Sequence, residues 1–407
     1  MNKHLGIMLV SALLAAMVMA PGARAAKNYG PGVSDTEIKL GNTTPYSGPI
    51  SSVSTTAKTE LAYFAMLNAQ GGVNGRKINF ISLDDGYSPP KALEQTRKLV
   101  ESDNVLAIVA TPGTPPNVAT HKYLNDRHVP QLLIGSGAML FDDLKHFPWS
   151  APFTPSIDME GRVYASYIAK TKPDAKIAVL YQDDDFGHGM LAGFTKQLGD
   201  KAKTMIVKET SYNVTDPTVD SQMIEMQGSG ADAFVFMGTA KAAAQAIRKE
   251  YDLGWKPLRI TSWASSSVSG ALKPAGLGKS IGLLSATVFL TPADPTIKND
   301  KEVGDYLAFL KKWYPAADPA DVFVIQGYIQ AQLTEIMLKN CGDDLTRANL
   351  MKQALSFKNV RVPMMMPGIM INIQPGSAQM FNQMQLVRFD GTAWVRFGDI
   401  VTVDTAH

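Results

Sequence analysis

The sequence is short of cysteine and of net charge, and each shortage excludes a class of protein. Cys341 is the one cysteine among 407 residues, so the chain can form neither an internal disulfide nor a cysteine-based zinc site. Lys and Arg number 39 and Asp and Glu number 37, which gives a formal net charge of +2. Because nucleic-acid binding needs clustered positive charge, we expect no nucleic-acid partner. The 45% of hydrophobic residues is typical of a packed globular protein.

The one long apolar run lies at the amino terminus. Lys3 precedes residues 5–20, which are apolar except for one serine, and the small residues of Ala23-Arg24-Ala25 follow. This order is the signature of a secretory signal peptide, here residues 1–25. We expect Sec-type export to the periplasm with cleavage near Ala25. An uncleaved membrane anchor is the alternative, but the run is shorter than the roughly 20 residues that span a bilayer.

Motifs for catalysis and for metal binding are nearly absent. Residues 276–280 (GLGKS) fail as a phosphate-binding loop, because Lys273 stands where that motif needs its first glycine. Ser136 does not have the G-x-S-x-G spacing of a nucleophile elbow, and no histidine lies in an H-E-x-x-H pattern. Asp183-Asp184-Asp185 is more typical of a turn or helix cap than of a cation site. We therefore expect no enzyme, no metal and no cofactor, with a hydrolase using Ser136 as the catalytic alternative.

Strand and helix patterns alternate along the chain, and the alternation restarts near residue 150. Apolar runs such as 105–109 (VLAIV) and 233–237 (AFVFM) indicate strands covered on both faces, and a helical pattern follows each. The repeated units predict an α/β fold with two doubly wound parallel sheets. Residues 384–389 and 392–397 flank Asp390-Gly391, which predicts a final two-residue hairpin. A hairpin after several helices indicates that the chain crosses between its lobes more than once.

Small, hydroxyl-bearing residues follow two neighbouring predicted strands. Thr114 lies just after strand 105–109, at the expected start of a helix, and Gly135-Ser136-Gly137-Ala138 follows strand 129–134. Ligands of open α/β sheets bind at the carboxyl ends of the strands. A helix start also offers unpaired N–H groups and a positive dipole end to an anion. The two loops together predict a site that holds a carboxylate with neutral dipoles.

Seven short segments extend this pattern over the whole mature chain. They are 38–41 (IKLG), 47–49 (SGP), 68–75 (NAQGGVNG), 84–85 (DD), 181–187 (YQDDDFG), 230–233 (GADA) and 254–257 (GWKP). In order and spacing they resemble the periplasmic solute-binding proteins of ABC importers. The most similar group is the branched-chain-amino-acid type, which has the type I periplasmic-binding fold.

The resemblance implies two doubly wound α/β lobes joined by three crossover segments. Lobe 1 is expected to contain residues 26–149 plus 289–370, and lobe 2 residues 150–288 plus 371–407. It also implies a small-molecule ligand, trapped when the lobes close about a hinge and then delivered to an ABC importer permease in the inner membrane. The protein is expected to be a monomer.

The resemblance also assigns ligand contacts to loops that border the cleft. In the family, the loop matching Gly113 and Thr114 supplies a hydroxyl and N–H groups to the ligand carboxylate, and the loop matching 136–139 supplies further donors. Met139 stands where amino-acid binders often have threonine. Phe186 takes the place of the usual tyrosine that packs on the ligand, and Thr239 lies near another frequent contact.

Two further contacts rest on position alone. Tyr46 and Tyr87 each follow a strand whose end is expected to border the cleft. The complete set of expected ligand-binding residues is Tyr46, Tyr87, Gly113, Thr114, Ser136, Gly137, Ala138, Met139, Phe186, Thr239 and Trp263.

Trp263 is the departure that bears most on the ligand. Amino-acid binders of this family commonly have a glutamate near this position, which pairs with the ligand ammonium. A buried ammonium without such a partner would cost several kcal/mol. We therefore expect an aromatic or other apolar organic acid with no obligatory amino group. In the alternative, Trp263 is a core residue, Asp184 or Asp185 pairs with an amine, and the ligand is a branched-chain or other amino acid. A periplasmic ligand sensor is a second alternative.

Overall fold

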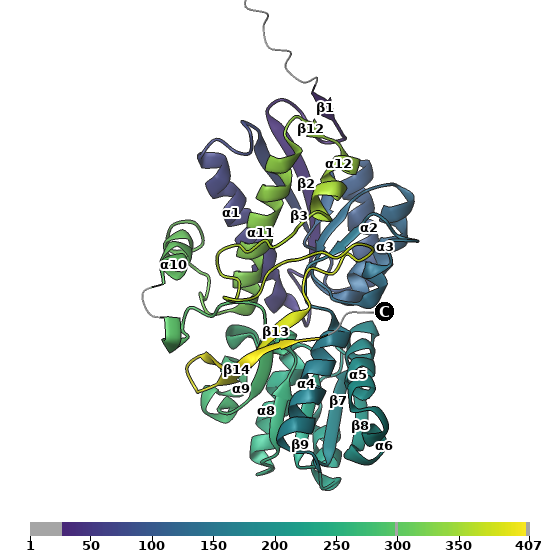
Figure 1. The fold of residues 1–407 in the computed structure, drawn as a ribbon, viewed down its shortest axis with the longest axis vertical. Helices are drawn as coiled ribbons and strands as arrows, with labels where there is room; N and C mark the ends of the chain where they lie inside the picture. Colours follow the sequence, from purple (N-terminus) through teal and green to yellow (C-terminus); the bar gives the residue numbers. More distant parts are fainter. Residues whose placement is uncertain (1–26, 298–299, 404–407) are drawn as a thin grey trace, which may run out of the picture.

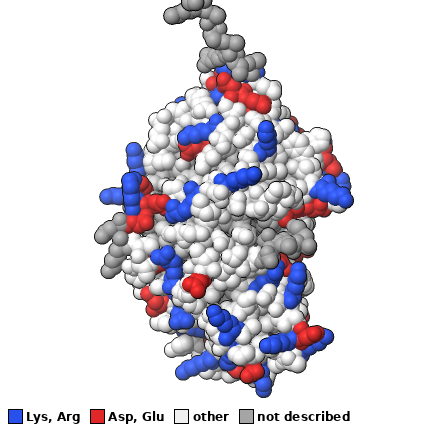
Figure 2. All heavy atoms as spheres, viewed as in Figure 1, with Lys and Arg blue, Asp and Glu red and all other residues white. Residues whose placement is uncertain are grey.

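Two separate sheets, one in each lobe, organise the computed structural model, which describes residues 27–297 and 300–403. The lobes are stacked along the long axis of the molecule, and Figure 2 shows that positive and negative side chains are interspersed over both. The predicted signal peptide at 1–25 lies outside the described residues. Within those residues, no helix combines the length and the hydropathy needed to cross a bilayer.

Lobe 1 is built on a parallel sheet with the strand order β3-β2-β4-β5-β6. Its strands are β2 (Glu37–Thr44), β3 (Lys77–Asp84), β4 (Ala107–Val109), β5 (Gln131–Ile134) and β6 (Ser150–Pro152). Successive residues of a strand point to opposite faces. Ile108 of β4 therefore packs with Leu99 and Leu124, whereas Val109 belongs to the main hydrophobic core. Both faces of the sheet are thus buried, as the apolar run predicted.

The helices of lobe 1 come from two distant parts of the chain. They are α1 (Thr55–Ala69), α2 (Pro89–Glu101), α3 (Thr114–Asp126), α10 (Lys301–Trp313), α11 (Val322–Cys341) and α12 (Arg347–Ala354). Helix α2 packs on α3, and α1 packs on α11, which returns from beyond lobe 2 (Figure 1). The short strands β1 (Asn28–Tyr29) and β12 (Asp344–Leu345) form a separate parallel pair.

Lobe 2 has a mixed sheet with the order β14-β13-β11-β10-β9-β7-β8. Its strands are β7 (Ile177–Gln182), β8 (Ile206–Tyr212), β9 (Ala233–Met237), β10 (Leu258–Thr261), β11 (Leu284–Thr287), β13 (Gln383–Phe389) and β14 (Trp394–Thr402). Its helices are α4 (Ile157–Thr171), α5 (Asp185–Leu198), α6 (Ala202–Met205), α7 (Asp220–Gly228), α8 (Ala240–Asp252) and α9 (Lys273–Ala275). Strands β7 to β11 are parallel, and the final hairpin adds two antiparallel strands.

The tip of that hairpin is shifted by one residue from the predicted Asp390-Gly391. Phe389 pairs with Trp394, and the Asp390 N–H donates to the Ala393 carbonyl at 3.0 Å, which leaves Gly391 and Thr392 at the tip. The Asp390 carboxylate accepts hydrogen bonds from the backbone N–H groups of Thr392 (2.7 Å) and Ala393 (2.8 Å). Bonds of this kind from an aspartate side chain stabilise a turn and place Asp390 before the tip rather than in it.

Two lobe boundaries also differ from the expected ones. Strand β6 (Ser150–Pro152) pairs with β5, so it belongs to lobe 1 although we had assigned it to lobe 2. Residues 371–373, expected in lobe 2, belong with lobe 1, because the N–H of Ile371 donates to the Val360 carbonyl at 2.8 Å and that of Ile373 to the Phe357 carbonyl at 3.0 Å. In both places the hydrogen bonds to lobe 1 extend a few residues beyond the boundary that the sequence predicted.

Three crossover segments join the lobes, and each has one phenylalanine at the junction. The ring of Phe153 stacks on that of Phe289 with 6.1 Å between centroids and meets that of Phe381 edge-on at 5.7 Å. All three side chains are buried. The three crossover segments are therefore packed against one another through a single aromatic cluster.

The two sheets share a topology that favours binding between the lobes. In lobe 1, β2 lies between β3 and β4, and in lobe 2, β7 lies between β8 and β9. In each sheet the second strand in sequence lies on one side of the first strand (β2 or β7), and the later strands lie on its other side, so the strand order reverses beside β2 and beside β7. Ligands of open α/β sheets bind outside the carboxyl ends of the strands at such a reversal.

Candidate functional site

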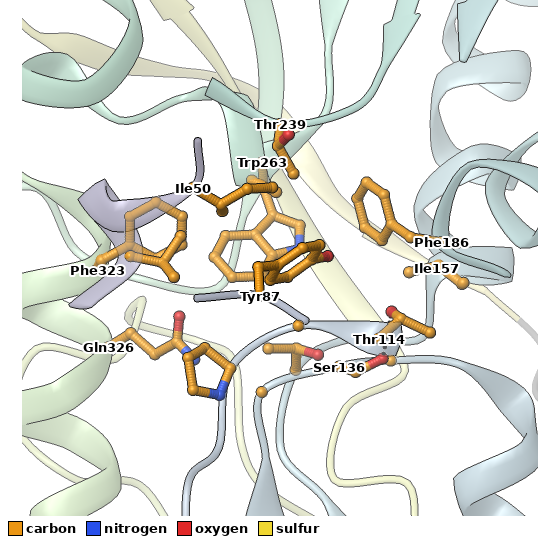
Figure 3. A pocket seen from close by; sticks show the side chains of 17 residues that line it. Ile50, Tyr87, Thr114, Ser136, Ile157, Phe186, Thr239, Trp263, Phe323 and Gln326 are labelled. Carbon is orange, nitrogen blue, oxygen red and sulfur yellow. Dashed lines mark hydrogen bonds between the residues drawn. The ribbon is translucent and has the colours of Figure 1, made fainter. Parts of the chain in front are cut away.

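A cavity of about 50 Å³ lies between the lobes at the carboxyl ends of both sheets. Most of the contacts expected from the sequence line it (Figure 3). The predicted residues that line the cavity are Tyr87, Gly113, Thr114, Ser136, Gly137, Phe186, Thr239 and Trp263. The first five come from lobe 1 and the last three from lobe 2, so the cavity has one wall from each lobe.

Three of the predicted contacts do not line the cavity. Met139 begins a short 3-10 helix, and 38% of its surface is exposed. The Tyr46 hydroxyl donates to Ser82 at 2.8 Å, within lobe 1. The backbone N–H of Ala138 donates to the Ser136 hydroxyl at 3.2 Å, so Ala138 holds that side chain in place. The expectation that these three contact a ligand stays untested.

The lobe 1 wall presents hydroxyl and N–H groups. Thr114 Oγ1 and Ser136 Oγ are 2.7 Å apart and share a hydrogen bond. Among the described residues, the backbone N–H groups of Thr114, Ser136 and Gly137 have no hydrogen-bond partner. The start of α3 offers fewer donors than we expected, because Gly113 N–H donates to the Gly135 carbonyl at 3.0 Å and the next two helix residues are prolines without an N–H. Anion-binding donors therefore come from two loops rather than from the helix start alone.

Glycines are required where these loops approach the rest of the site. A Cβ on Gly137 would lie 1.9 Å from the carbonyl oxygen of Pro155, in the first crossover. Gly113 has a φ of +92°, and a Cβ there would lie 2.4 Å from the Tyr87 ring. A side chain at either position would push the loops apart, so small residues here serve the close packing of backbone around the cavity.

Aromatic rings supply most of the remaining surface. Trp263 follows β10 and meets the Phe323 ring with 5.8 Å between centroids. Phe186 lies in the first turn of α5, where the Asp184 carboxylate accepts from the N–H of Phe186 at 3.0 Å. Burial raises the pKa of Asp184. Asp184 caps the helix, and neither it nor Asp185 is among the described residues that line the cavity.

No Asp, Glu, Lys or Arg is among the described residues that line the cavity. Glu160 lies behind Trp263, where its Oε1 accepts from the backbone N–H of Trp263 at 2.7 Å and from the Tyr164 hydroxyl at 2.6 Å. Burial raises the pKa of this carboxyl to about 7. Glu160 thus binds the backbone of Trp263 and is not among the described residues that line the cavity.

Contacts between the lobes on either side of the cavity indicate a closed arrangement. Asp321, the N-cap of α11 in lobe 1, accepts hydrogen bonds from Ser267 (2.6 Å) and Ser269 of lobe 2. The pKa of the Tyr87 hydroxyl is raised by its burial and, to a smaller extent, by Asp184 across the cleft. The hydrogen bonds between Asp321 and the two serines can form only while the lobes are together.

Sequence reasoning missed a further set of lining residues. They are Ile50, Val53, Thr154, Ile157, Ala264, Phe323 and Gln326, whereas Pro112 and Gly135 belong to the two loops that were expected to border the site. Phe323 and Gln326 lie on α11, more than 180 residues along the chain from Ser136 in the lobe 1 loops, which line the same cavity. A glutamine within the apolar run 322–329 was the one signal that this helix is more than core.

Two α/β lobes, three crossovers and a cavity at the carboxyl ends of both sheets define the type I periplasmic-binding fold. The family model described as periplasmic binding protein matches residues 37–393. The chain therefore belongs to the periplasmic binding protein family.

Relatives with named ligands span several chemistries. The Leu/Ile/Val-binding protein homolog 7 of Brucella suis is 25% identical over 268 residues, which cover 64% of this chain and 63% of that protein. A branched-chain amino acid ABC transporter protein from Thermus thermophilus with bound valine has a TM-score of 0.80 at 16% identity, covering 91% of this chain and 98% of its own. A solute binding protein from R. palustris in complex with benzoate has a TM-score of 0.75 at 21% identity, covering 90% and 98%. At these identities the solved structures establish the fold alone.

Proposed function

We propose that this protein is the extracytoplasmic binding component of an ABC importer and that its ligand is a carboxylate with an aromatic or other apolar body. The observation that supports this most directly is the cavity lining, which combines neutral donors on one wall with aromatic rings and has no charged side chain among the described residues. The ligand is bound and released unchanged, so the protein needs no catalytic group.

The lining favours an anion over an ammonium. Hydroxyl and backbone N–H groups donate to a carboxylate, and hydrogen bonds to an ionised acceptor are about twice as strong as neutral ones. The amino-terminal end of α3 adds a favourable dipole beside Thr114. An ammonium in the same cavity would have only neutral acceptors, and a buried cation without a carboxylate partner is strongly unfavourable.

Capture is proposed to follow from closure of the lobes. A ligand that contacts Thr114 on one wall and Trp263 on the other binds the closed state better than the open one, and this difference in affinity shifts the population. A membrane permease would then recognise the closed surface. We further propose a periplasmic location, with a signal peptide at residues 1–25 cleaved near Ala25, and a monomeric protein.

A branched-chain or other amino acid is the second candidate ligand, because relatives with that name and a valine-bound structure share the fold. A benzoate-bound structure shares it equally. The indole of Trp263 favours the acid, and so does the lack of a carboxylate among the described residues that line the cavity. A sensor of the same ligand would use the same closure, and uptake measured after deletion of the gene separates it from a transport component.

Calorimetric titration of the purified protein tests the choice of ligand. The panel contains leucine, valine, benzoate and phenylpropenoate, and we expect the acids to bind and the amino acids to bind weakly or not at all. Tight binding of leucine with no response to the acids would contradict the proposal.

A further inference from the structure

Gln326 forms a second polar group at the far side of the cavity. It lies on α11, three residues after Phe323 and so on the same helix face. Figure 3 shows Gln326 and Phe323 on one side of the cavity, Thr114 and Ser136 on the other, and Tyr87 and Trp263 between them.

The Gln326 amide is buried without a partner. The residue is 2% exposed, and its Oε1 has no hydrogen bond in the described structure. Gln330 also has an unpaired Oε1, but its amide nitrogen and that of Gln332 donate to the carbonyls of Leu133 (2.8 Å) and Tyr328 (3.1 Å), whereas neither amide atom of Gln326 has a partner among the described residues. Gln326 is the glutamine of this helix that lines the cavity. A buried acceptor without a donor is unfavourable, so a ligand that brings a donor to it gains affinity.

We propose that Gln326 selects acids that have a hydroxyl at the end remote from the carboxylate, such as para-hydroxy aromatic acids. This inference rests on the proposed function, since it assumes that the carboxylate lies at Thr114 and Ser136. The amide of Gln326 has a free acceptor, Oε1, and a free donor, Nε2, and a ligand hydroxyl suits both because it is a donor to Oε1 and an acceptor from Nε2. That donor is neutral, because no lining residue among those described could neutralise a cation. A flat ring between Tyr87 and Trp263 would hold the two polar ends of the ligand apart.

Matched ligand pairs test this selectivity. The dissociation constants of 4-hydroxybenzoate, 4-methylbenzoate and 4-methoxybenzoate, and of the corresponding phenylpropenoates, are measured by calorimetry on the full mature chain. The methyl group has nearly the size of the hydroxyl but no donor, and the methoxy group is an acceptor only. We expect the hydroxy acid to bind roughly 10- to 100-fold more tightly than the methyl acid.

Variants show whether Gln326 is the cause. In Gln326→Leu the preference for the hydroxy acid should fall to within about threefold, because the acceptor is gone. Gln197→Leu, on the exposed surface of α5, is the matched control and should retain the full preference. If Gln326→Leu does not fold, Gln326→Met provides the same comparison with a side chain close to glutamine in shape.

The possible failures are distinguishable. Equal binding of the hydroxy and methyl acids by the unmodified protein, tighter binding of the methoxy acid, or a preference that survives in Gln326→Leu would overturn this inference and leave the proposed function intact. If none of the acids bound, the proposed function would fail and the inference with it.

Discussion

The hydrogen bond between Thr114 and Ser136 predicts that their contributions to ligand binding are strongly coupled. Their hydroxyl oxygens are 2.7 Å apart, so one of the two hydroxyl protons is used between them and one remains for the ligand. If Ser136→Ala removes one hydroxyl, the proton of the other is free to turn toward the carboxylate. Each single substitution, Ser136→Ala or Thr114→Val, should therefore weaken binding by less than about twofold, because one hydroxyl proton remains for the carboxylate.

The double substitution leaves no hydroxyl for the ligand. A hydrogen bond to a charged group is worth about 1.5–3 kcal/mol, so the pair together should cost about 10- to 150-fold in affinity, far more than the product of the two single effects. The assay is calorimetric titration of the four proteins with the tightest-binding acid. Ser356→Ala, an exposed serine after α12, should leave binding unchanged. Additive effects, or a single variant as weak as the double, would refute the sharing of one proton.

Three further predictions concern closure, stability and pH. Alanine at both Ser267 and Ser269 removes the lobe 2 donors to Asp321. Ligand affinity should therefore fall about tenfold, and small-angle scattering should detect a more open protein. An unchanged shape and affinity would show that these hydrogen bonds do not hold the lobes together. Phe153→Ala should lower the free energy of unfolding by about 3–5 kcal/mol in chemical denaturation, because a fully buried ring of the aromatic cluster in the crossover segments is lost. A change below about 1 kcal/mol would mean that the packing of the crossover segments does not depend on this ring. Burial raises the pKa of Glu160 from 4.5 to about 7, so the unfolded chain releases this proton at lower pH than the folded protein, and about 3 kcal/mol of stability is lost as the pH rises from 4.5 to 7. Glu160→Gln retains the acceptor for the Trp263 N–H and should lack that loss in thermal melts from pH 4 to 8. Identical pH profiles of the two proteins would contradict the pKa shift.

Local patterns in the sequence predicted most of the fold. Helix and strand periodicity depends on neighbours within a few residues, so the alternating elements and the restart near residue 150 were identified correctly. Errors occurred where hydrogen bonds with distant segments extend an element, as at Ser150 in β6, or where a side chain changes a turn, as at Asp390.

The site was predicted only on the walls formed by loops that follow strands. Thr114, Ser136 and Trp263 lie at strand ends, and strand order converts such positions into neighbours. Phe323 and Gln326 lie within a helix whose residues read as core, and only the return of the chain to lobe 1 brings them to the cavity.

By itself the sequence determined the two-lobed α/β architecture and the two loops of lobe 1 that line the cavity, because periodicity and loop chemistry are short-range properties. The tertiary structure decided the direction in which carboxylates point. Glu160 faces the backbone of Trp263 and Asp184 caps a helix, so the cavity is left to neutral groups. Side-chain direction and burial depend on packing between segments far apart in the chain, and no local pattern encodes them.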